Sequence, residues 1–494
     1  MRPATSFGPD RRLLSVFAAL AVGLVGMRFY LFRPFLDDPH AFRQAWTSYY
    51  AIDLYQSGLN IFRPSIISMG NHRHILIEFP FPEWITALLY HVTGPTLLVD
   101  RVVSIAFFLG SAYFLFRLVA LIQDRLLAWT VVLVYMAVPL GIYFSRAIHI
   151  DAAALCCGHA LLFYFLRYGE TGRKRDLAGA FVASALGFLI KAPYVFFLIL
   201  PALYAQLSRR QWRVAAMSAA AFGAALAVGL AWYGYAQTVN RRAPDLSVVK
   251  GFEPTADRVD FYVGTADRRF ASDDWRTIRT RLRREIAGEV WWMLLPLGLV
   301  WRGSLRSFAA VWTLGTVGSL LLFFAANVLH NYYQLTFAAP FAIWLAIPLY
   351  RGLRAEGRFA SLLRPLALVL LVGYVGTGVR FVIRNYYQID REGMLVGEFV
   401  RGKTTDSDLV IMAYNDAYYL DPRYLYYAQR RGWSVRGVWL EPQAIEGLRA
   451  HGATVVVTSD RWPAPPPTAR YLEAFPIIDT LLLGNDQVFL RRFN

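Results

Sequence analysis

Carboxylates stand at both ends of one polar stretch near the start of the chain. Asp37 and Asp38 come directly after the first apolar segment, and Glu78 follows about forty residues later, where the sequence EFPFP becomes apolar again. A carboxylate can remove a proton from a hydroxyl group, and a basic side chain beside it can hold an anion. His40 and Arg43 closely follow the acidic pair. The stretch therefore predicts acid–base chemistry next to an anionic group.

The elements that carry these side chains are predicted to lie in a membrane. Of 494 residues, 56% are hydrophobic and 17% charged, and the mean hydropathy is +0.37. Repeated apolar stretches reach the length of about 20 residues that a membrane-spanning helix requires. The first of them, 13–32, follows Arg11 and Arg12 like a signal peptide. It is too long for one and lacks a small-residue cleavage site, so we expect an uncleaved anchor.

The apolar pattern predicts about eleven spans. They cover residues 13–32, 98–122, 126–144, 152–168, 177–190, 193–207, 213–235, 289–301, 307–328, 332–350 and 362–383. With the N-terminus inside, the arginines of the short loops fall on the cytoplasmic side, as the positive-inside rule requires. The loops 34–82 and 236–288 and the segment after the last span then lie outside. We expect a multi-pass protein of the bacterial inner (plasma) membrane whose site faces the periplasm.

The net charge of +17 and the pI of about 9.9 would also suit a nucleic-acid-binding protein. Most arginines flank the predicted spans, however, where they attract anionic lipid head groups. We therefore expect membrane lipids as partners and no nucleic acid. Cys156 and Cys157 are adjacent within a span and suit no ordinary disulfide. The lack of a zinc-type cysteine pattern, a P-loop or a Gly-rich dinucleotide motif argues against chemistry driven by a soluble nucleotide.

A change of composition near Asn385 marks a second domain. Strand-like runs at 408–414, 434–440, 454–460 and 487–493 alternate with helix-like runs at 421–431 and 441–450. The alternation predicts a small α/β domain over 385–494, with the PAPPP sequence at 463–467 as a stiff connector. The transmembrane catalytic domain would then cover 1–384.

The predicted topology brings eight polar residues to the outer side of the membrane. They are Asp37, Asp38, His40, Arg43, Glu78, Asp151, Lys191 and His330. Each alone has an ordinary explanation as a solvated loop charge, a snorkelling side chain or a helix cap, and their shared face is what favours a site. If a sugar linked to polyprenyl phosphate bound there, Arg43, Lys191 and His330 would suit its phosphate. Asp37 or Asp38 would suit the attacking hydroxyl.

Two local patterns bear on this site. Lys191 precedes Ala192 and Pro193, and the proline is expected to interrupt the helix and free the backbone to approach a ligand. The stretch 41–57 places Phe42, Trp46, Tyr49 and Tyr50 along one helical side. This second pattern suits either an amphipathic helix that lies in the membrane interface or an ordinary aromatic belt.

The chain resembles the GT-C superfamily of integral membrane glycosyltransferases, in particular the bacterial branch related to protein O-mannosyltransferases and the lipid A aminoarabinose transferase. The resemblance rests on DDPHAFRQ at 37–44, EFPFPEW at 78–84, FSRAIHIDAAAL at 144–155, LIKAPYVF at 189–196 and HNYYQLTFAAP at 330–340. It covers residues 13–383. The implied fold is a polytopic α-helical membrane protein of GT-C type, and the C-terminal α/β domain is similar to the variable outer domain of many relatives.

Carried over position by position, the resemblance implies roles for single residues. Asp37 or Asp38 would be the catalytic base, Glu78 the acid of the second loop motif and Asp151 the acid that opens a later span. The donor-phosphate side would comprise Arg43, Lys191 and Tyr332 or Tyr333. Many relatives have an Asp-Glu pair and Glu-Lys-Pro-Pro where this chain has DDPH and EFPFP, so the lysine after Glu78 is missing. Some relatives bind a divalent metal, for which Glu78 and His330 would be the candidate ligands.

The expected activity is transfer of a hexose or pentose from a polyprenyl-phosphate donor to a lipid, glycan or protein acceptor, with inversion at the anomeric carbon. One alternative is a transporter or flippase of lipid-linked sugars, which would also place charges in membrane cavities. Transporters commonly show two related halves, and the sequence has no such symmetry. A polymerase or ligase of surface polysaccharide is a further alternative with the same donor type.

Overall fold

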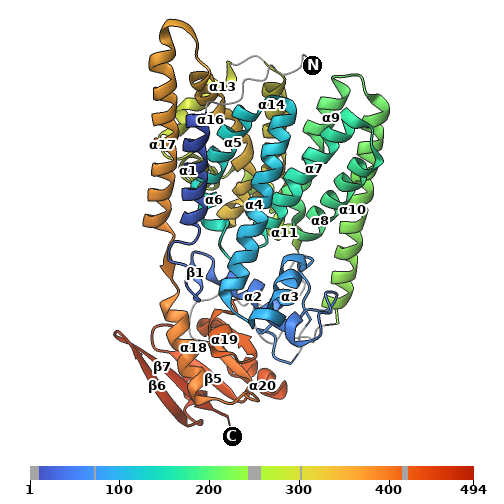
Figure 1. The fold of residues 1–494 in the computed structure, drawn as a ribbon. Coiled ribbons are helices and arrows are strands. Elements are labelled where there is room, and N and C mark those ends of the chain that lie inside the picture. Colours follow the sequence, from blue (N-terminus) through green and yellow to red (C-terminus); the bar gives the residue numbers. More distant parts are fainter. Residues whose placement is uncertain (1–10, 72–73, 243–257, 301–302, 414–420, 494) are drawn as a thin grey trace. The chain divides into compact units, whose positions relative to one another are not determined.

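A computed structural model of the chain describes residues 11–71, 74–242, 258–300, 303–413 and 421–493. The chain forms two compact units (Figure 1). Unit 1 comprises residues 1–32, 101–232 and 257–387, and unit 2 comprises residues 33–100, 233–256 and 388–494. The expected domain boundary at 384/385 lies near the last change of unit. The expected first outer loop, 34–82, belongs to the same unit as the C-terminal residues.

Unit 1 is a bundle of helices (Figure 1). Its main helices are α1 (Arg11–Met27), α4 (Leu97–Ile122), α5 (Arg125–Ala137), α7 (Asp151–Thr171), α8 (Lys174–Val195), α10 (Trp212–Asn240), α14 (Ser304–Leu322), α16 (Ala338–Leu353) and α17 (Ala360–Asn385). Shorter helices connect them: α6 (Pro139–Phe144), α9 (Ile199–Leu207), α11 (Arg258–Tyr262), α12 (Ser272–Arg281), α13 (Leu295–Leu299) and α15 (Phe324–Leu329). Unit 1 also contains a π-helical turn, η2 (Leu282–Ile286), and a 3₁₀-helix, η4 (Asn331–Phe337).

Seven helices within the described ranges are long and apolar enough to cross a membrane. They cover Leu97–Ile122, Asp151–Thr171, Lys174–Val195, Trp212–Asn240, Leu305–Leu322, Asn331–Leu353 and Gly357–Asn385. The other four expected spans coincide with shorter elements: α1, the pair α5 and α6, α9, and the segment around α13. The chain is therefore a polytopic α-helical membrane protein, and the total of about eleven spans stays a prediction.

Unit 2 contains a five-stranded sheet in the order β4-β3-β5-β7-β6. The strands are β3 (Val410–Ala413), β4 (Gly432–Ser434), β5 (Val455–Ser459), β6 (Ile477–Leu483) and β7 (Asp486–Arg492). The first three pair in parallel, whereas β7 pairs antiparallel with β5 and β6. Every residue of β3, β4 and β5 is buried, because apolar side chains cover both faces of the parallel part. The apolar runs of β3 and β5 made these two strands visible in the sequence.

Helices cover this sheet: α18 (Arg391–Lys403), α19 (Arg423–Ala428), α20 (Pro442–Ala450) and α21 (Pro466–Leu472). The strand expected over 434–440 is wrong, because β4 ends at Ser434 and residues Gly437–Trp439 form a 3₁₀-turn. A Cβ at Gly437 would lie 2.5 Å from the carbonyl oxygen of Trp462, so the backbone packs too closely there for an ordinary strand side chain. The PAPPP sequence leads directly into α21, with Pro466 as its first residue.

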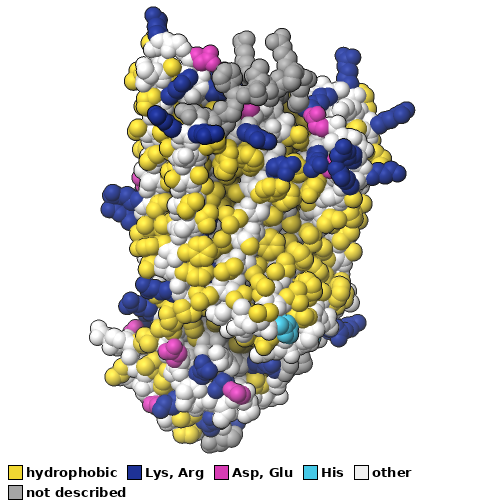
Figure 2. Space-filling model, in the orientation of Figure 1, with side chains coloured by type: hydrophobic (Ala, Val, Ile, Leu, Met, Phe, Trp, Pro, Cys, Tyr) yellow, Lys and Arg dark blue, Asp and Glu magenta, His cyan; other side chains and the backbone are white. Residues whose placement is uncertain are grey.

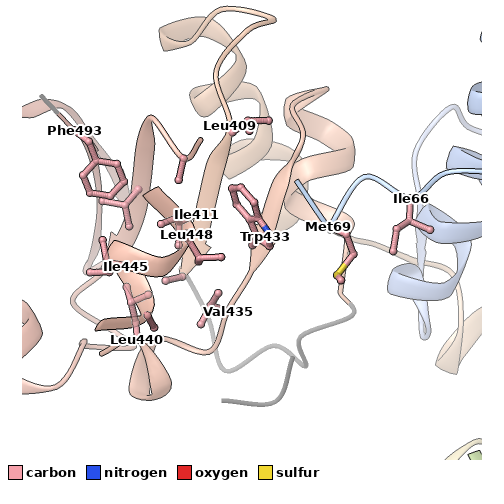
Figure 3. Packing of buried hydrophobic residues seen from close by; sticks show 14 of the residues in the cluster. Ile66, Met69, Leu409, Ile411, Trp433, Val435, Leu440, Ile445, Leu448 and Phe493 are labelled. Carbon is pink, nitrogen blue, oxygen red and sulfur yellow. The ribbon is translucent and has the colours of Figure 1, made fainter. Parts of the chain in front are cut away.

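The first loop folds together with the C-terminal residues in unit 2. Its elements are α2 (Ala41–Gln56), α3 (Phe81–Thr93) and the short strand β1 (Asp37–Asp38), which pairs antiparallel with β2 (Gln388–Ile389). Residues 66–70 run along β4, where Met69 pairs antiparallel with Trp433, and Ile66 and Met69 belong to the same apolar cluster as Trp433 (Figure 3). Gly70 has φ +58°, and a Cβ there would lie 2.1 Å from the Trp433 ring, so this close approach requires glycine.

The aromatic side chains of α2 have a different role from the expected one. A helix over 41–57 is confirmed, since α2 covers Ala41–Gln56. Trp46 and Tyr50, however, are 4% and 3% exposed and belong to the apolar core that contains Ile411 and Trp433. They pack against protein because the β-sheet supplies an apolar surface that the sequence of α2 alone does not reveal. Neither a membrane-interface helix nor an aromatic belt describes these two residues.

Candidate functional site

The candidate residues fall into two groups, one in each unit. Unit 2 holds Asp37, Asp38, His40, Arg43 and Glu78, and unit 1 holds Asp151, Lys191, His330, Tyr332 and Tyr333. Each group has its own local geometry.

The backbone of the acidic pair in unit 2 is fixed by strand pairing. Asp37 lies opposite Ile389 and Asp38 opposite Gln388 in the β1–β2 ladder. The amide of Leu36 donates to the Tyr427 hydroxyl at 3.0 Å, and its carbonyl accepts from the amide of Asp390 at 3.3 Å. A two-residue ladder is short, and these flanking hydrogen bonds extend it. The backbone of the predicted base is therefore held by residues that lie roughly 350 positions further along the chain.

A change of chain direction separates the acidic pair from the next charged residue. His40 adopts a left-handed conformation with φ 66° at the N-cap of α2, which is uncommon for a residue other than glycine. Arg43 follows in the first turn of this helix. Its Nη2 donates to Oε2 of Glu78 at 2.9 Å, and the two side chains are 12% and 16% exposed. The ion pair joins the DDPHAFRQ and EFPFPEW motifs, and both of its members remain partly accessible.

A second carboxyl in the EFPFPEW motif was missed by sequence reasoning. Glu83 lies in the first turn of α3 and is 4% exposed. Its Oε2 is buried and has no hydrogen-bond partner among the described residues. Burial raises the pKa of Glu83 to about 8, although Arg43 opposes the shift, and Glu78 and Asp100 add to it. The carboxyl is therefore largely protonated at neutral pH. The sequence signal that could have identified Glu83 is its position as an acidic residue within an otherwise apolar run.

Asp100 is the buried acceptor on the neighbouring side of α3. Its Oδ2 accepts from the Tyr90 hydroxyl at 2.6 Å and from Ser48 Oγ at 3.2 Å. These bonds join α2 and α3 to the start of α4, so that the two helices carrying Arg43 and Glu83 keep a fixed relation within unit 2. Burial, followed by the charge of Asp100, raises the pKa of Tyr90, which keeps its hydroxyl proton available for this bond.

The group in unit 1 is centred on Asp151, the first residue of α7. The carboxylate is fully buried and accepts from Lys191 Nζ at 2.7 Å. It also pairs closely with the Tyr194 hydroxyl and with Nδ1 of His149. The helix N-terminus adds a favourable dipole for a negative charge at this position. Asp151 thus has three side-chain partners inside the protein, of which His149 and Tyr194 were missed by sequence reasoning although both lie in the quoted motifs.

The backbone break expected around Pro193 is present. Lys191 has φ −162° and ψ 86° inside α8, which departs from helical geometry, and the carbonyl of Pro193 accepts from Ser319 Oγ at 2.7 Å. The break turns the Lys191 side chain toward Asp151 and an aromatic enclosure. Lys191 Nζ lies 4.3 Å and 4.4 Å from the ring centroids of Tyr332 and Tyr333. Ammonium groups are favoured over aromatic faces, so the rings reduce the cost of burying this charge.

The HNYYQ motif supplies those rings. It forms η4, whose backbone is tied to α8 by the Tyr194 hydroxyl, which donates to the carbonyl oxygen of Tyr332 at 2.5 Å. The His330 ring stacks on Tyr332 with 5.0 Å between centroids and an interplanar angle of 7°. Asp151, Lys191, Tyr332 and Tyr333 therefore form one cluster, with His330 stacked at its edge.

A further polar contact in unit 1 involves the same motif. Asn331 Nδ2 donates to Oε2 of Glu285 at 2.8 Å and to the Tyr386 hydroxyl at 3.1 Å. Glu285 lies in the π-helical turn η2, and burial raises its pKa. It belongs to the expected second outer loop, 236–288, of which residues 243–257 lie outside the described part. No sequence pattern singled out Glu285.

The geometry offers little for a metal ion. Glu78 and His330, the predicted ligands, belong to different units. No group of three or more His, Cys, Asp or Glu side chains suited to a metal occurs within the described ranges. Two ligands are fewer than the usual protein sites supply, so the divalent metal stays a prediction.

Comparison with known proteins shows which folds the chain resembles. A family model described as dolichyl-phosphate-mannose-protein mannosyltransferase matches residues 78–233. No match was found among curated protein sequences. Among solved structures, ArnT from Cupriavidus metallidurans, solved with bound undecaprenyl phosphate, is similar with a TM-score of 0.62 at 12% identity, over 97% of each chain.

Two other solved structures are similar. The oligosaccharyltransferase AglB from Archaeoglobus fulgidus, solved with an inhibitory peptide and a dolichol phosphate, has a TM-score of 0.58 at 11% identity over 90% of this chain and 69% of AglB. The arabinofuranosyltransferase AftD from Mycobacteria has a TM-score of 0.58 at 15% identity over 98% of this chain and 40% of AftD. The chain thus has the fold of the GT-C glycosyltransferases, with a small C-terminal sheet domain, and the resemblance in fold that the sequence indicated is confirmed.

Proposed function

We propose that the chain is a glycosyltransferase that moves a hexose or pentose from a polyprenyl-phosphate donor to a hydroxyl of a lipid, glycan or protein acceptor. The observation that carries the proposal is the fold shared with ArnT over 97% of both chains, in a relative solved with undecaprenyl phosphate. It is supported by an acidic pair on a fixed backbone and by an adjacent Arg43–Glu78 ion pair, both in unit 2.

The reaction is an inverting displacement. Asp37 or Asp38 takes the proton of the acceptor hydroxyl, and the hydroxyl oxygen forms a bond to the anomeric carbon. The bond between this carbon and the phosphate oxygen breaks, and polyprenyl phosphate leaves with the electron pair. Because the leaving group is a phosphate, which is stable as an anion, no general acid is needed at that end.

The positive charge for the donor phosphate comes from Arg43. A guanidinium can bind a phosphate through two parallel N–H bonds while one of its groups still contacts Glu78. Glu78 holds the guanidinium in place before the donor arrives, which reduces the ordering needed on binding. Lys191, His330, Tyr332 and Tyr333 stay predicted donor-side residues. Both cations have an acidic partner, Asp151 for Lys191 and Glu78 for Arg43, but the Arg43 side chain is 12% exposed and that of Lys191 only 2%. Arg43 is therefore the stronger phosphate contact.

The proposed location is the bacterial inner membrane, with the site and the C-terminal residues outside the cytoplasm. The support is the distribution of Lys and Arg side chains, many of which lie at the end of the helical unit where α4 and α7 end (Figure 2). Alkaline phosphatase fused after Asn494 should be active in cells. Activity of a reporter that works only in the cytoplasm would contradict this orientation.

The function is tested by mass spectrometry of glycolipids and surface glycans from a deletion strain and the same strain carrying the gene. We expect one sugar to be absent in the deletion strain and restored on complementation. A polyprenyl-phosphate sugar that accumulates in the deletion strain would identify the donor. Unchanged glycans and carrier lipids would contradict the proposal, and loss of a sugar from one leaflet only, with purified transfer activity absent, would favour a flippase.

A further inference from the structure

A cavity of about 700 Å³ opens at one end of unit 1, and none of the candidate catalytic residues lines it. It lies where α4 and α7 end and α5 begins. Its lining combines three aromatic side chains, Phe116, Trp129 and Phe163, with three arginines, Arg117, Arg125 and Arg167. Arg167 is 16 residues after Asp151 on α7, which corresponds to about 24 Å along the helix axis. The cavity is therefore separate from the Asp151 cluster.

The acids near the cavity form ion pairs with cations other than Arg117 and Arg125. Glu170, the acidic residue of the lining, pairs with Arg209, and Asp176 accepts from Arg167 Nε at 3.3 Å. Asp124, next to Arg125 in sequence, pairs instead with Arg354 at 3.2 Å. In the described part of the chain, neither Arg117 nor Arg125 forms an ion pair.

The Arg117 guanidinium is nevertheless held in place. Its Nη1 donates to the Tyr113 hydroxyl at 2.6 Å, and its Cζ lies 5.2 Å from the centroid of the Phe163 ring. A guanidinium fixed on an aromatic face keeps most of its N–H donors available and loses little freedom when an anion binds. Arg125 is exposed at the first position of α5, at the rim of the same cavity.

Part of the cavity lining is apolar. The Phe116 and Trp129 rings meet edge to face at 5.1 Å, and Phe163 is 4% exposed. Phe116 and Phe163 lie on α4 and α7, both long and apolar enough to cross a membrane, within two turns or so of their last residues. A cavity with cationic groups at the rim and aromatic walls at the level of span ends matches a molecule with an anionic head and a hydrocarbon tail.

We propose that this cavity binds an anionic phospholipid of the bilayer, with the head-group phosphate on Arg117 and Arg125 and an acyl chain against Phe116, Trp129 and Phe163. The unpaired positive charge makes a lipid with a net negative head group the favoured occupant. A zwitterionic lipid would bring its own cation close to the arginines. The site goes beyond the proposed transfer reaction, since it needs neither sugar donor nor acceptor.

The test is native mass spectrometry of the purified full-length protein, titrated with phosphatidylglycerol or phosphatidylcholine. We expect phosphatidylglycerol to bind more tightly by roughly 10-fold or more, because each arginine near a lipid surface contributes to anion binding. The double variant Arg117→Gln/Arg125→Gln should lose this preference. The matched control Arg173→Gln/Arg175→Gln removes two exposed charges near the same helix ends, outside the lining, and should retain it.

A second variant tests the apolar part independently of charge. Ala120→Trp should fill the cavity and weaken phosphatidylglycerol binding while the arginines remain. Equal binding of the two lipids to the wild type, or equal loss in the control variant, would overturn the proposal. So would displacement of the lipid by millimolar inorganic phosphate, which would indicate a small-anion site. Selective binding of undecaprenyl phosphate in place of phosphatidylglycerol would assign the cavity to a carrier lipid and overturn it as well.

Discussion

The two ion pairs formed by candidate site residues differ in how deeply they are buried. Lys191 and Asp151 in unit 1 have side chains that are 2% and 0% exposed, whereas those of Arg43 and Glu78 in unit 2 are 12% and 16% exposed. Tyr194 and His149 complete the surroundings of Asp151, and tyrosine rings cover Lys191. A closed pair satisfies its own charges and fixes the helices that carry it. In a more accessible pair, the cation can contact a ligand while it stays beside its acidic partner, so no buried carboxylate loses its counter-charge.

The difference predicts that the Lys191–Asp151 pair stabilises the fold, whereas Arg43 of the other pair binds the proposed donor. A buried ion pair that loses one partner leaves an uncompensated charge in a low-dielectric interior, which is far more costly than the same loss near water. The Arg43–Glu78 pair is less completely buried, so loss of one partner leaves a charge that water can reach and should cost less stability. Variants of the two pairs should therefore separate stability from activity.

The largest effect is expected from Lys191→Met. The Asp151 carboxylate would stay buried without its cation, and the free energy of unfolding should fall by about 3–5 kcal/mol. Thermal unfolding in detergent measures the change. The double variant Asp151→Asn/Lys191→Met removes both charges and should recover part of the loss. If Lys191→Met unfolded like the wild type, the closed pair would not hold the fold.

A smaller effect, on binding, is expected from Arg43→Gln. Loss of a charge-assisted contact should raise the donor dissociation constant roughly 10- to 100-fold, while the unfolding temperature changes little. Competition with free polyprenyl phosphate measures the affinity. Lys191→Ala is the matched comparison, with a smaller loss of donor affinity expected. A larger loss for Lys191→Ala than for Arg43→Gln would reverse the assignment of the two pairs.

The smallest effect concerns Glu83, beside the open pair. Its folded pKa of about 8 lies above the ordinary value of 4.5, so the folded state binds a proton more tightly than the unfolded state. The stabilising contribution of this proton is fully present below the ordinary pKa of 4.5, and it is lost as the pH rises from there through the folded pKa of about 8. Glu83→Gln keeps a neutral side chain, so its unfolding temperature should rise relative to the wild type by a few degrees between pH 6 and pH 9. A constant difference would mean that Glu83 is ionised throughout.

The sequence predicted the membrane helices and the motifs better than it predicted contacts. Long apolar runs mark α4, α10 and α17 because a span must be apolar along its length. The Pro193 break was also visible, since proline removes a backbone donor. The Arg43–Glu78 contact was not, because it depends on how α3 packs beside α2. Asp151 and the tyrosines near it belong to motifs that lie roughly 180 positions apart in the sequence, and only the fold brings them together.

The C-terminal strands show the same limit. Val410–Ala413 and Val455–Ser459 were recognisable as buried runs. The strand-like run 434–440 suggested a strand, but β4 ends at Ser434 and Gly437–Trp439 form a 3₁₀-turn. The short β1–β2 ladder that fixes Asp37 and Asp38 had no sequence signal, because a two-residue pairing depends on tertiary contacts and not on local propensity.

The most direct test of the account is transfer by the purified protein with a polyprenyl-phosphate sugar, for the wild type, Asp37→Asn and Asp38→Asn. Loss of the base should lower the transfer rate roughly 100- to 10,000-fold in one of the two variants and leave donor affinity within about twofold of the wild type. Donor binding measured on the same samples serves as the control for folding. Full transfer activity in both variants would contradict the proposed base and, with it, the catalytic role of unit 2.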